Sequence, residues 1–187
     1  MAAEPERLAG DLHVDVVAMR RRHLRGVLRI ESQVYPRPWS LGLFLSELGL
    51  RSTRVYVVAK VGVTVVGYGG LMLAAGDGHI TTIAVDPAWH RRGIGTRLLL
   101  VLSRAGVRLG CTGLTLEVRV SNDAAREMYR QFGYVPAGIR KNYYSESNED
   151  AIVMWAHDVD LPAYADRLAT IDAALSGTTA VEEGLGA

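Results

Sequence analysis

The sequence has one cysteine, Cys111, no apolar run near the ~20 residues of a membrane span, and almost no excess of charge of either sign. A single cysteine cannot form an intrachain disulfide, so we expect a protein that works in a reducing cytoplasm. The net charge of +1 gives no electrostatic sign of nucleic-acid binding, and nothing in the sequence predicts membrane insertion. Residues 1–12 lack an apolar core, so we expect a flexible leader rather than a signal peptide.

Strand and helix patterns alternate along the chain, whose length suits one domain with a sizeable core. Turn signals between β-branched runs predict that the strands at 54–60, 64–74 and 79–85 are antiparallel neighbours. Further strands are expected at 13–18, 114–120, 134–142 and 151–157, and helices at 20–34, 40–50, 92–109 and 121–133, the last capped by Ser121. This order predicts an α/β chain with a mixed, mostly antiparallel sheet and helices on both faces.

The C-terminal part favours one more helix at 161–175, with Pro162 in its first turn and Gly177 past its end. Its apolar stripe favours docking on its own domain over a partner surface. We expect disorder after this helix. The predicted organisation is therefore a leader, a main domain, and a C-terminal helix with a disordered tail, at residues 1–12, 13–157 and 158–187.

A glycine-rich stretch, His90-Arg91-Arg92-Gly93-Ile94-Gly95, lies between the strand at 79–85 and the helix at 92–109. Free backbone N–H groups at a helix start bind phosphate, and glycine lets a ligand approach the backbone closely. The stretch is not a dinucleotide fingerprint, because Leu98 occupies the third glycine position, and no Gly-Lys-Ser/Thr of a Walker A loop follows. Taken alone, it is equally compatible with a helix start that binds nothing.

This stretch resembles the coenzyme A loop of the GNAT family of N-acetyltransferases, Gln/Arg-x-x-Gly-x-Gly/Ala, with His90 at its first position. A second family motif follows in order, and its residues are Asn122, Ala125, Tyr129, Gly133 and Tyr134. The resemblance covers roughly residues 14–157 and implies the GNAT fold, acetyl-CoA as cosubstrate and no metal. By resemblance, the coenzyme-binding residues are Ile83, Ala84, Val85, Arg91, Arg92, Gly93, Ile94, Gly95, Thr96 and Asn122. A bulge in the strand at 79–85 would open a cleft beside the strand at 114–120.

Glu117 is the candidate base, because an amine must be neutral to attack a thioester. Alternation along the strand at 114–120 places Glu117 on one face with Thr115 and Arg119. Two predicted helices flank this strand, so we expect it inside the sheet with its carboxylate partly desolvated. The resemblance to RimI-type enzymes of the family implies Glu117 as proton acceptor and Tyr129 as proton donor. From pattern alone, Tyr129 would be a core aromatic and Asn122 a helix cap.

The substrate is implied by further resemblance to the RimI-type enzymes, at residues 116–122, 140–144 and 149–151. These enzymes acetylate the N-terminal α-amino group of a ribosomal protein, so the expected partner is a protein N-terminus. Tyr35, Trp39, Tyr143 and Tyr144 would flank the peptide, although loop packing is an alternative role for all four. Acetylation of lysine or small amines is a second possible activity, since a fold does not fix its substrate. A third possibility is an acyl-CoA-binding protein without catalysis, against which the intact Glu117 and Tyr129 argue. The sequence leaves the oligomeric state open.

Overall fold

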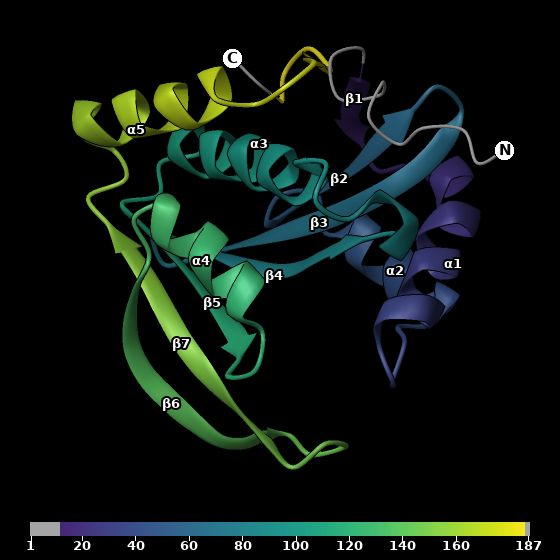
Figure 1. The fold of residues 1–187 in the computed structure, drawn as a ribbon, viewed down its shortest axis with the longest axis horizontal. Helices are drawn as coiled ribbons and strands as arrows, with labels where there is room; N and C mark the ends of the chain where they lie inside the picture. The colour runs from purple at the N-terminus through teal and green to yellow at the C-terminus, as the bar shows by residue number, and fades with distance from the viewer. Residues whose placement is uncertain (1–11, 186–187) are drawn as a thin grey trace, which may run out of the picture.

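The computed structural model describes residues 12–185, so the predicted leader lies outside the described residues except for Leu12. The described strands form one eight-stranded sheet in the order β6-β7-β5-β4-β3-β2-β1-β8 (Figure 1). The strands are β1 His13–Ala18, β2 Arg54–Val61, β3 Thr64–Ala74, β4 Asp77–Val85, β5 Gly113–Arg119, β6 Val135–Tyr144, β7 Glu149–His157 and β8 Thr178–Val181. The helices are α1 Leu24–Val34, α2 Leu41–Gly49, α3 Ile94–Arg108, α4 Asp123–Gln131 and α5 Pro162–Ala173.

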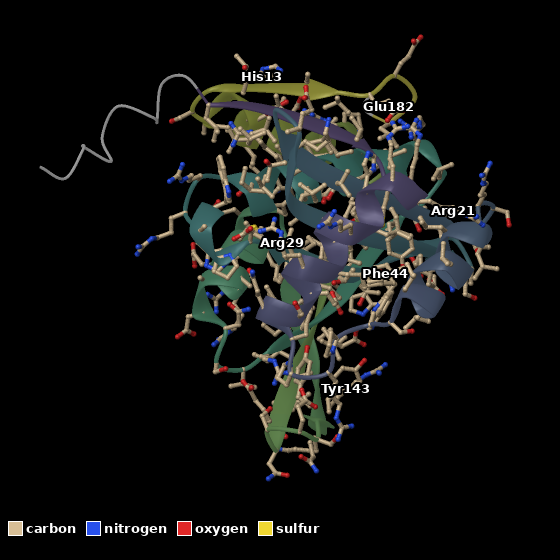
Figure 2. The ribbon with its side chains drawn as sticks, turned by 90° about the vertical axis from the view of Figure 1, so that its right-hand side faces the viewer. His13, Arg21, Arg29, Phe44, Tyr143 and Glu182 are labelled. Carbon is tan, nitrogen blue, oxygen red and sulfur yellow. The ribbon has the colours of Figure 1, made fainter. Side chains whose placement is uncertain are left out.

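The predicted mixed, mostly antiparallel sheet is confirmed. β2, β3 and β4 pair in antiparallel succession, whereas β4–β5 and β1–β8 are parallel pairs. Helices cover both faces, because neighbouring residues of each strand point into different apolar clusters. Val57 of β2 packs in the cluster on the α3 side, and Val58 packs in the cluster with α1 and α2. Figure 2 is turned toward the second face, with Arg29 labelled on α1 and Phe44 on α2.

The sheet opens between β4 and β5, as a bulge in the strand at 79–85 was expected to allow. Leu71 of β3 pairs with Ile80 and Gly70 pairs with Thr82, so Thr81 is the extra, bulged residue of β4. Pairing between β4 and β5 ends at His79 and Thr115. Beyond that pair the two strands diverge, and the carboxyl-terminal halves of both border a cleft.

Two local predictions need correction. Asn122, not Ser121, caps α4, since its Oδ1 accepts a hydrogen bond from the N–H of Ala125 at 3.1 Å. The N–H of Ser121 instead donates to Glu149 of β7. The first helix begins at Leu24, because residues 21–23 form a 3₁₀ turn.

The expected disorder after the last helix is wrong for Thr178–Val181, which form β8. These residues pair in parallel with β1, where His13 lies opposite Thr178 and Val16 opposite Val181. β-Branched residues suit such pairing, and the added strand covers an otherwise open sheet edge. The helix α5 docks on its own domain as predicted, with Tyr164 and Leu168 buried. Within residues 12–185, no helix is both long enough and apolar enough to cross a membrane.

Candidate active site

The opening between β4 and β5 is part of a cleft of about 350 Å³. The loop between α1 and α2, the start of α4 and the β6–β7 hairpin complete its walls. Eight residues predicted for the site line this one cavity, and they are Tyr35, Trp39, Ile83, Glu117, Asn122, Tyr129, Tyr143 and Tyr144. The structure therefore brings the predicted base, acid and peptide-flanking aromatics together from four separate segments of the chain.

Glu117 is held by two cationic or protonatable side chains from other strands. Its side chain is 9% exposed, and its Oε2 lies 3.0 Å from Nε2 of His79 on β4. Its Oε1 lies 3.3 Å from an Nη of Arg140 on β6. Both carboxylate oxygens therefore have a defined direction inside a cleft wall, as a base needs if it is to meet an amine in one orientation.

His79 and Arg140 are site residues that sequence reasoning missed. In the parallel register His79 lies opposite Thr115, and Glu117 is the next residue of β5 on the same face. No sequence pattern predicts the contact between His79 and Glu117, because 38 positions separate these two residues. The contact could have been predicted only if β4 and β5 had been predicted to pair in parallel in this register.

Tyr129 of α4 lines the cleft and is 8% exposed. Burial raises the pKa of its phenol well above the ordinary range, and the nearby Tyr35 and Tyr144 act in the same direction. The hydroxyl therefore stays protonated at neutral pH and is suited to donate a proton rather than accept one. Its ring packs against Tyr134, with the centroids 5.8 Å apart.

Two aromatic residues reach the cleft from the α1–α2 loop. The Tyr35 hydroxyl lies 3.2 Å from Oγ1 of Thr82 and donates to the carbonyl of Ile83 at 3.3 Å, so it joins the loop to β4. The N–H of Trp39 donates to the buried Glu31 carboxylate at 2.8 Å. Burial raises the pKa of Glu31, while this backbone hydrogen bond acts in the opposite direction. The loop is thus fixed at both of its aromatic residues.

Of the other two aromatics, Tyr144 is held by a cation at the end of β5. The Arg119 guanidinium lies 3.8 Å from the ring centroid of Tyr144. It also pairs with Glu146 at 2.6 Å and with Glu149 at 3.0 Å, so it ties the β6–β7 turn to β5. Tyr143 packs edge-on against Tyr144. Figure 2 shows Tyr143 toward the end of the molecule where this hairpin projects.

The glycine stretch lies where β4 ends and α3 begins. Gly93 is the N-cap of α3 with φ +72°, and Arg91 two residues earlier has φ +58°. No side chain of the described residues caps α3, and the N–H of Arg97 is bonded to the carbonyl of Gly93 at 3.1 Å. The N–H groups of Ile94, Gly95 and Thr96 precede that first helical bond and so have no intrahelical acceptor.

These groups fit a pyrophosphate. A Cβ at Gly95 would find Met128 Sδ at 3.5 Å as its nearest neighbour, which is ordinary contact, so packing within the chain does not demand glycine there. Close approach of a ligand to the backbone would demand it. The side chains of Ala84 and Ile94 are buried in the core, so these two residues offer a ligand only their backbone.

The loop before α3 is anchored to the rest of the fold. Buried Asp86 follows β4 and accepts a hydrogen bond from Arg29 of α1 at 2.7 Å. His90, which departs from the family pattern, donates from Nε2 to the carbonyl of Val85 at 3.0 Å. Exposed Arg92 lies over the ring of Trp89, 4.9 Å from its centroid. His90 therefore fixes the loop against the strand end.

Comparisons with known proteins agree on one family. The family model for the acetyltransferase (GNAT) family matches residues 24–134. The N-alpha-acetyltransferase RimI of Mycobacterium tuberculosis is 37% identical over 150 residues, which cover 75% of this chain and 90% of that protein. A ribosomal protein bS18-alanine N-acetyltransferase of Salmonella typhimurium is 35% identical over 128 residues, which cover 67% of this chain and 85% of that protein. The crystal structure of the ribosomal-protein-S18-alanine N-acetyltransferase from Escherichia coli matches with a TM-score of 0.70 and 30% identity, covering 78% of this chain and 94% of that one.

Proposed function

The chain belongs to the acetyltransferase (GNAT) family, and from this premise we propose that it transfers the acetyl group of acetyl-CoA to the N-terminal α-amino group of a protein. The proposed substrate is a ribosomal protein of the bS18 kind, because the relatives that match most of this chain carry that activity in their names. The observation that carries the proposal is the convergence of Glu117 and Tyr129 on one cleft. The glycine loop packs on the same helix as Tyr129, because a Cβ at Gly95 would lie 3.5 Å from Met128 of α4.

In this proposal the loop at 91–96 holds the coenzyme by its backbone N–H groups. Acetyl-CoA, when bound, supplies the acetyl group as a thioester. The edge of β4 at Ile83 to Val85 would hold the pantetheine arm, together with Asn122 at the start of α4. The opening between β4 and β5, where their pairing ends at His79 and Thr115, would admit the arm to the cleft.

Side chains of the chain itself accept and donate the protons of the reaction. Glu117 accepts the proton that the α-ammonium loses, directly or through water, while His79 and Arg140 keep the carboxylate oriented. Tyr129, which lines the same cleft and whose phenol is protonated at neutral pH, donates a proton to the departing sulfur. The four aromatics Tyr35, Trp39, Tyr143 and Tyr144 flank the peptide.

An α-amine is a better substrate for a carboxylate base than a lysine side chain is. The α-amino pKa is about 8 against about 10.4 for lysine, so a base of modest strength can free the α-amine near neutral pH. A ribosomal substrate also agrees with action in the cytoplasm, which the single cysteine suggests.

The test is mass spectrometry after incubation with acetyl-CoA and one peptide. The peptide carries a bS18-type N-terminus with a free amine and one internal lysine, and a matched peptide with a blocked N-terminus is the control. We expect one acetyl group, on the N-terminus of the first peptide only. Acetylation of the blocked peptide at its lysine would establish the alternative activity, and absence of turnover with tight acetyl-CoA binding would favour a binding protein.

A further inference from the structure

The C-terminal segment, defined here as residues 158–185, lies beyond the part of the chain matched by the family model. It docks on the main domain through α5, which lies along α3, and through β8, which extends the sheet beside β1 (Figure 1). Arg104 of α3 pairs with Asp172 of α5 at 2.8 Å. At the other end of the segment Arg20 pairs with Glu182, which Figure 2 shows beside the end of β8.

Arg97 connects this segment to the glycine loop. Although it is an arginine, it is 1% exposed. Its Nε donates to Oγ1 of Thr179 at 2.8 Å, one Nη donates to the carbonyl of Ser176, and the other Nη donates to the carbonyl of Arg92 at 3.2 Å. A single buried guanidinium therefore holds two points of the C-terminal segment and one point of the loop.

Leu175 touches the same loop. A Cβ at Gly93 would lie 2.8 Å from Leu175 Cδ2 and 2.7 Å from Arg97 Nη1, so both side chains pack against this glycine and leave no room for a side chain there. The loop needs such support, because Arg91 has φ +58°, a region that non-glycine residues rarely occupy. Sparsely populated backbone conformations persist only where the surroundings hold them.

We infer that the C-terminal segment is a working part of the coenzyme site: through Arg97 and Leu175 it sets the conformation of the loop at 91–96. This inference rests on the proposed function, which assigns that loop to the pyrophosphate. Arg97 is a positioning residue, since it is buried and each of its three nitrogens donates a hydrogen bond within the chain itself. Holding the loop in its binding conformation before the coenzyme arrives lowers the entropic cost of binding.

The test compares Arg97→Met with the matched control Arg104→Met. Arg104 lies two turns further along α3 and also contacts the C-terminal segment, but it does not contact the loop. We expect the Kd for acetyl-CoA, measured by calorimetry, to rise about tenfold in Arg97→Met, as for a protein whose competent conformation has become a minor one. The kcat at saturating acetyl-CoA and the KM for peptide should stay near wild type. Arg104→Met should bind acetyl-CoA within about twofold of wild type, and Leu175→Ala should weaken binding in the same sense as Arg97→Met.

Amide hydrogen exchange without coenzyme gives a readout that does not depend on activity. In Arg97→Met the amides of residues 91–96 should exchange faster, while those of β3 keep their protection. Should Arg97→Met fail to fold, Leu175→Ala carries both measurements. Wild-type affinity and wild-type exchange in the loop would overturn the inference, as would equal weakening in Arg104→Met. If wild-type protein itself does not bind acetyl-CoA, the proposed function fails, and the exchange measurement still decides whether the segment holds the loop.

Discussion

At its proposed coenzyme end the site is made of backbone, whereas at its proposed amine end it is made of side chains. Around Gly93 the groups that face a ligand are N–H groups, while Ile94 and Arg97 turn their side chains into the protein. Around Glu117 the groups are the carboxylate of the proposed base and the imidazole and guanidinium that contact it, from three strands. The first arrangement depends on local conformation, and the second depends on how distant strands are placed. Mutations at the two ends should therefore change different kinetic constants.

The largest effect is expected from Glu117→Gln. The amide keeps the shape of the carboxylate but cannot take a proton, so kcat at pH 7 should fall roughly 10²- to 10⁴-fold, the usual range for a general base. Part of the loss should return at higher pH, because an α-amine with a pKa of about 8 then loses its proton without help. A pH–rate profile on a free N-terminal peptide measures both features. Superimposable profiles for wild type and variant would remove Glu117 as the base.

The next effect is expected from Tyr129→Phe, which keeps the ring and removes the hydroxyl. If the phenol protonates the departing thiolate, kcat should fall by about 10²-fold with the Kd for acetyl-CoA little changed. Because burial raises the Tyr129 pKa, the hydroxyl stays protonated through the neutral range, and wild-type turnover should show no loss of this acid below pH ~9.

Tyr134→Phe is the matched control, since Tyr134 packs on Tyr129 but does not line the cleft. Its turnover should remain close to wild type. If Tyr129→Phe and Tyr134→Phe have the same turnover, Tyr129 has only a structural role.

Gly95→Asp tests the backbone end. The new side chain would project where the pyrophosphate is expected and adds a negative charge, so the Kd for acetyl-CoA should rise about tenfold or more, of the order of a lost charge-assisted contact. The kcat at saturation should change little. Gly49→Asp is the control, because a Cβ there has no heavy atom within 4 Å. Unchanged affinity in Gly95→Asp, measured by calorimetry, would contradict the backbone cradle.

The smallest effect is expected from Arg119→Met, which releases the β6–β7 turn from β5. The KM for peptide should rise about twofold to fivefold, since a stacked cation at a solvent-accessible site contributes about 0.5–1 kcal/mol, and acetyl-CoA affinity should not change. Arg126→Met is the control, because Arg126 pairs with Asp123 on the surface of α4. A peptide KM that does not move would show that the Tyr144 position does not need this cation.

The difference between the two ends also explains what the sequence could predict. The loop at Gly93 and Gly95 is a local motif, and local patterns likewise predicted the three strands β2, β3 and β4. The contact of His79 with Glu117 depends on parallel register between strands separated by a helix, which no local pattern carries. The same holds for β8, whose partner β1 lies 165 positions earlier in the chain at the His13–Thr178 contact.

The bulge at Thr81 illustrates the middle case. A bulge in this strand could be expected from the cleft that the family needs, but its position depends on how β3 and β4 pair around Gly70 and Leu71.

The helix caps were likewise predicted only in part. Ser40 caps α2 as predicted, whereas neighbouring Ser121 and Asn122 both have capping side chains, and the contact of Ser121 with Glu149 leaves Asn122 to cap α4.

The most direct test of this division is to measure the Kd for acetyl-CoA and the single-turnover rate at saturating acetyl-CoA for Gly95→Asp, Glu117→Gln and wild type in one series. The account predicts a crossed result: Gly95→Asp binds about tenfold more weakly and turns over at nearly the wild-type rate, while Glu117→Gln binds as wild type does and turns over at least about 10²-fold more slowly. Loss of affinity in Glu117→Gln together with a wild-type affinity in Gly95→Asp would contradict it.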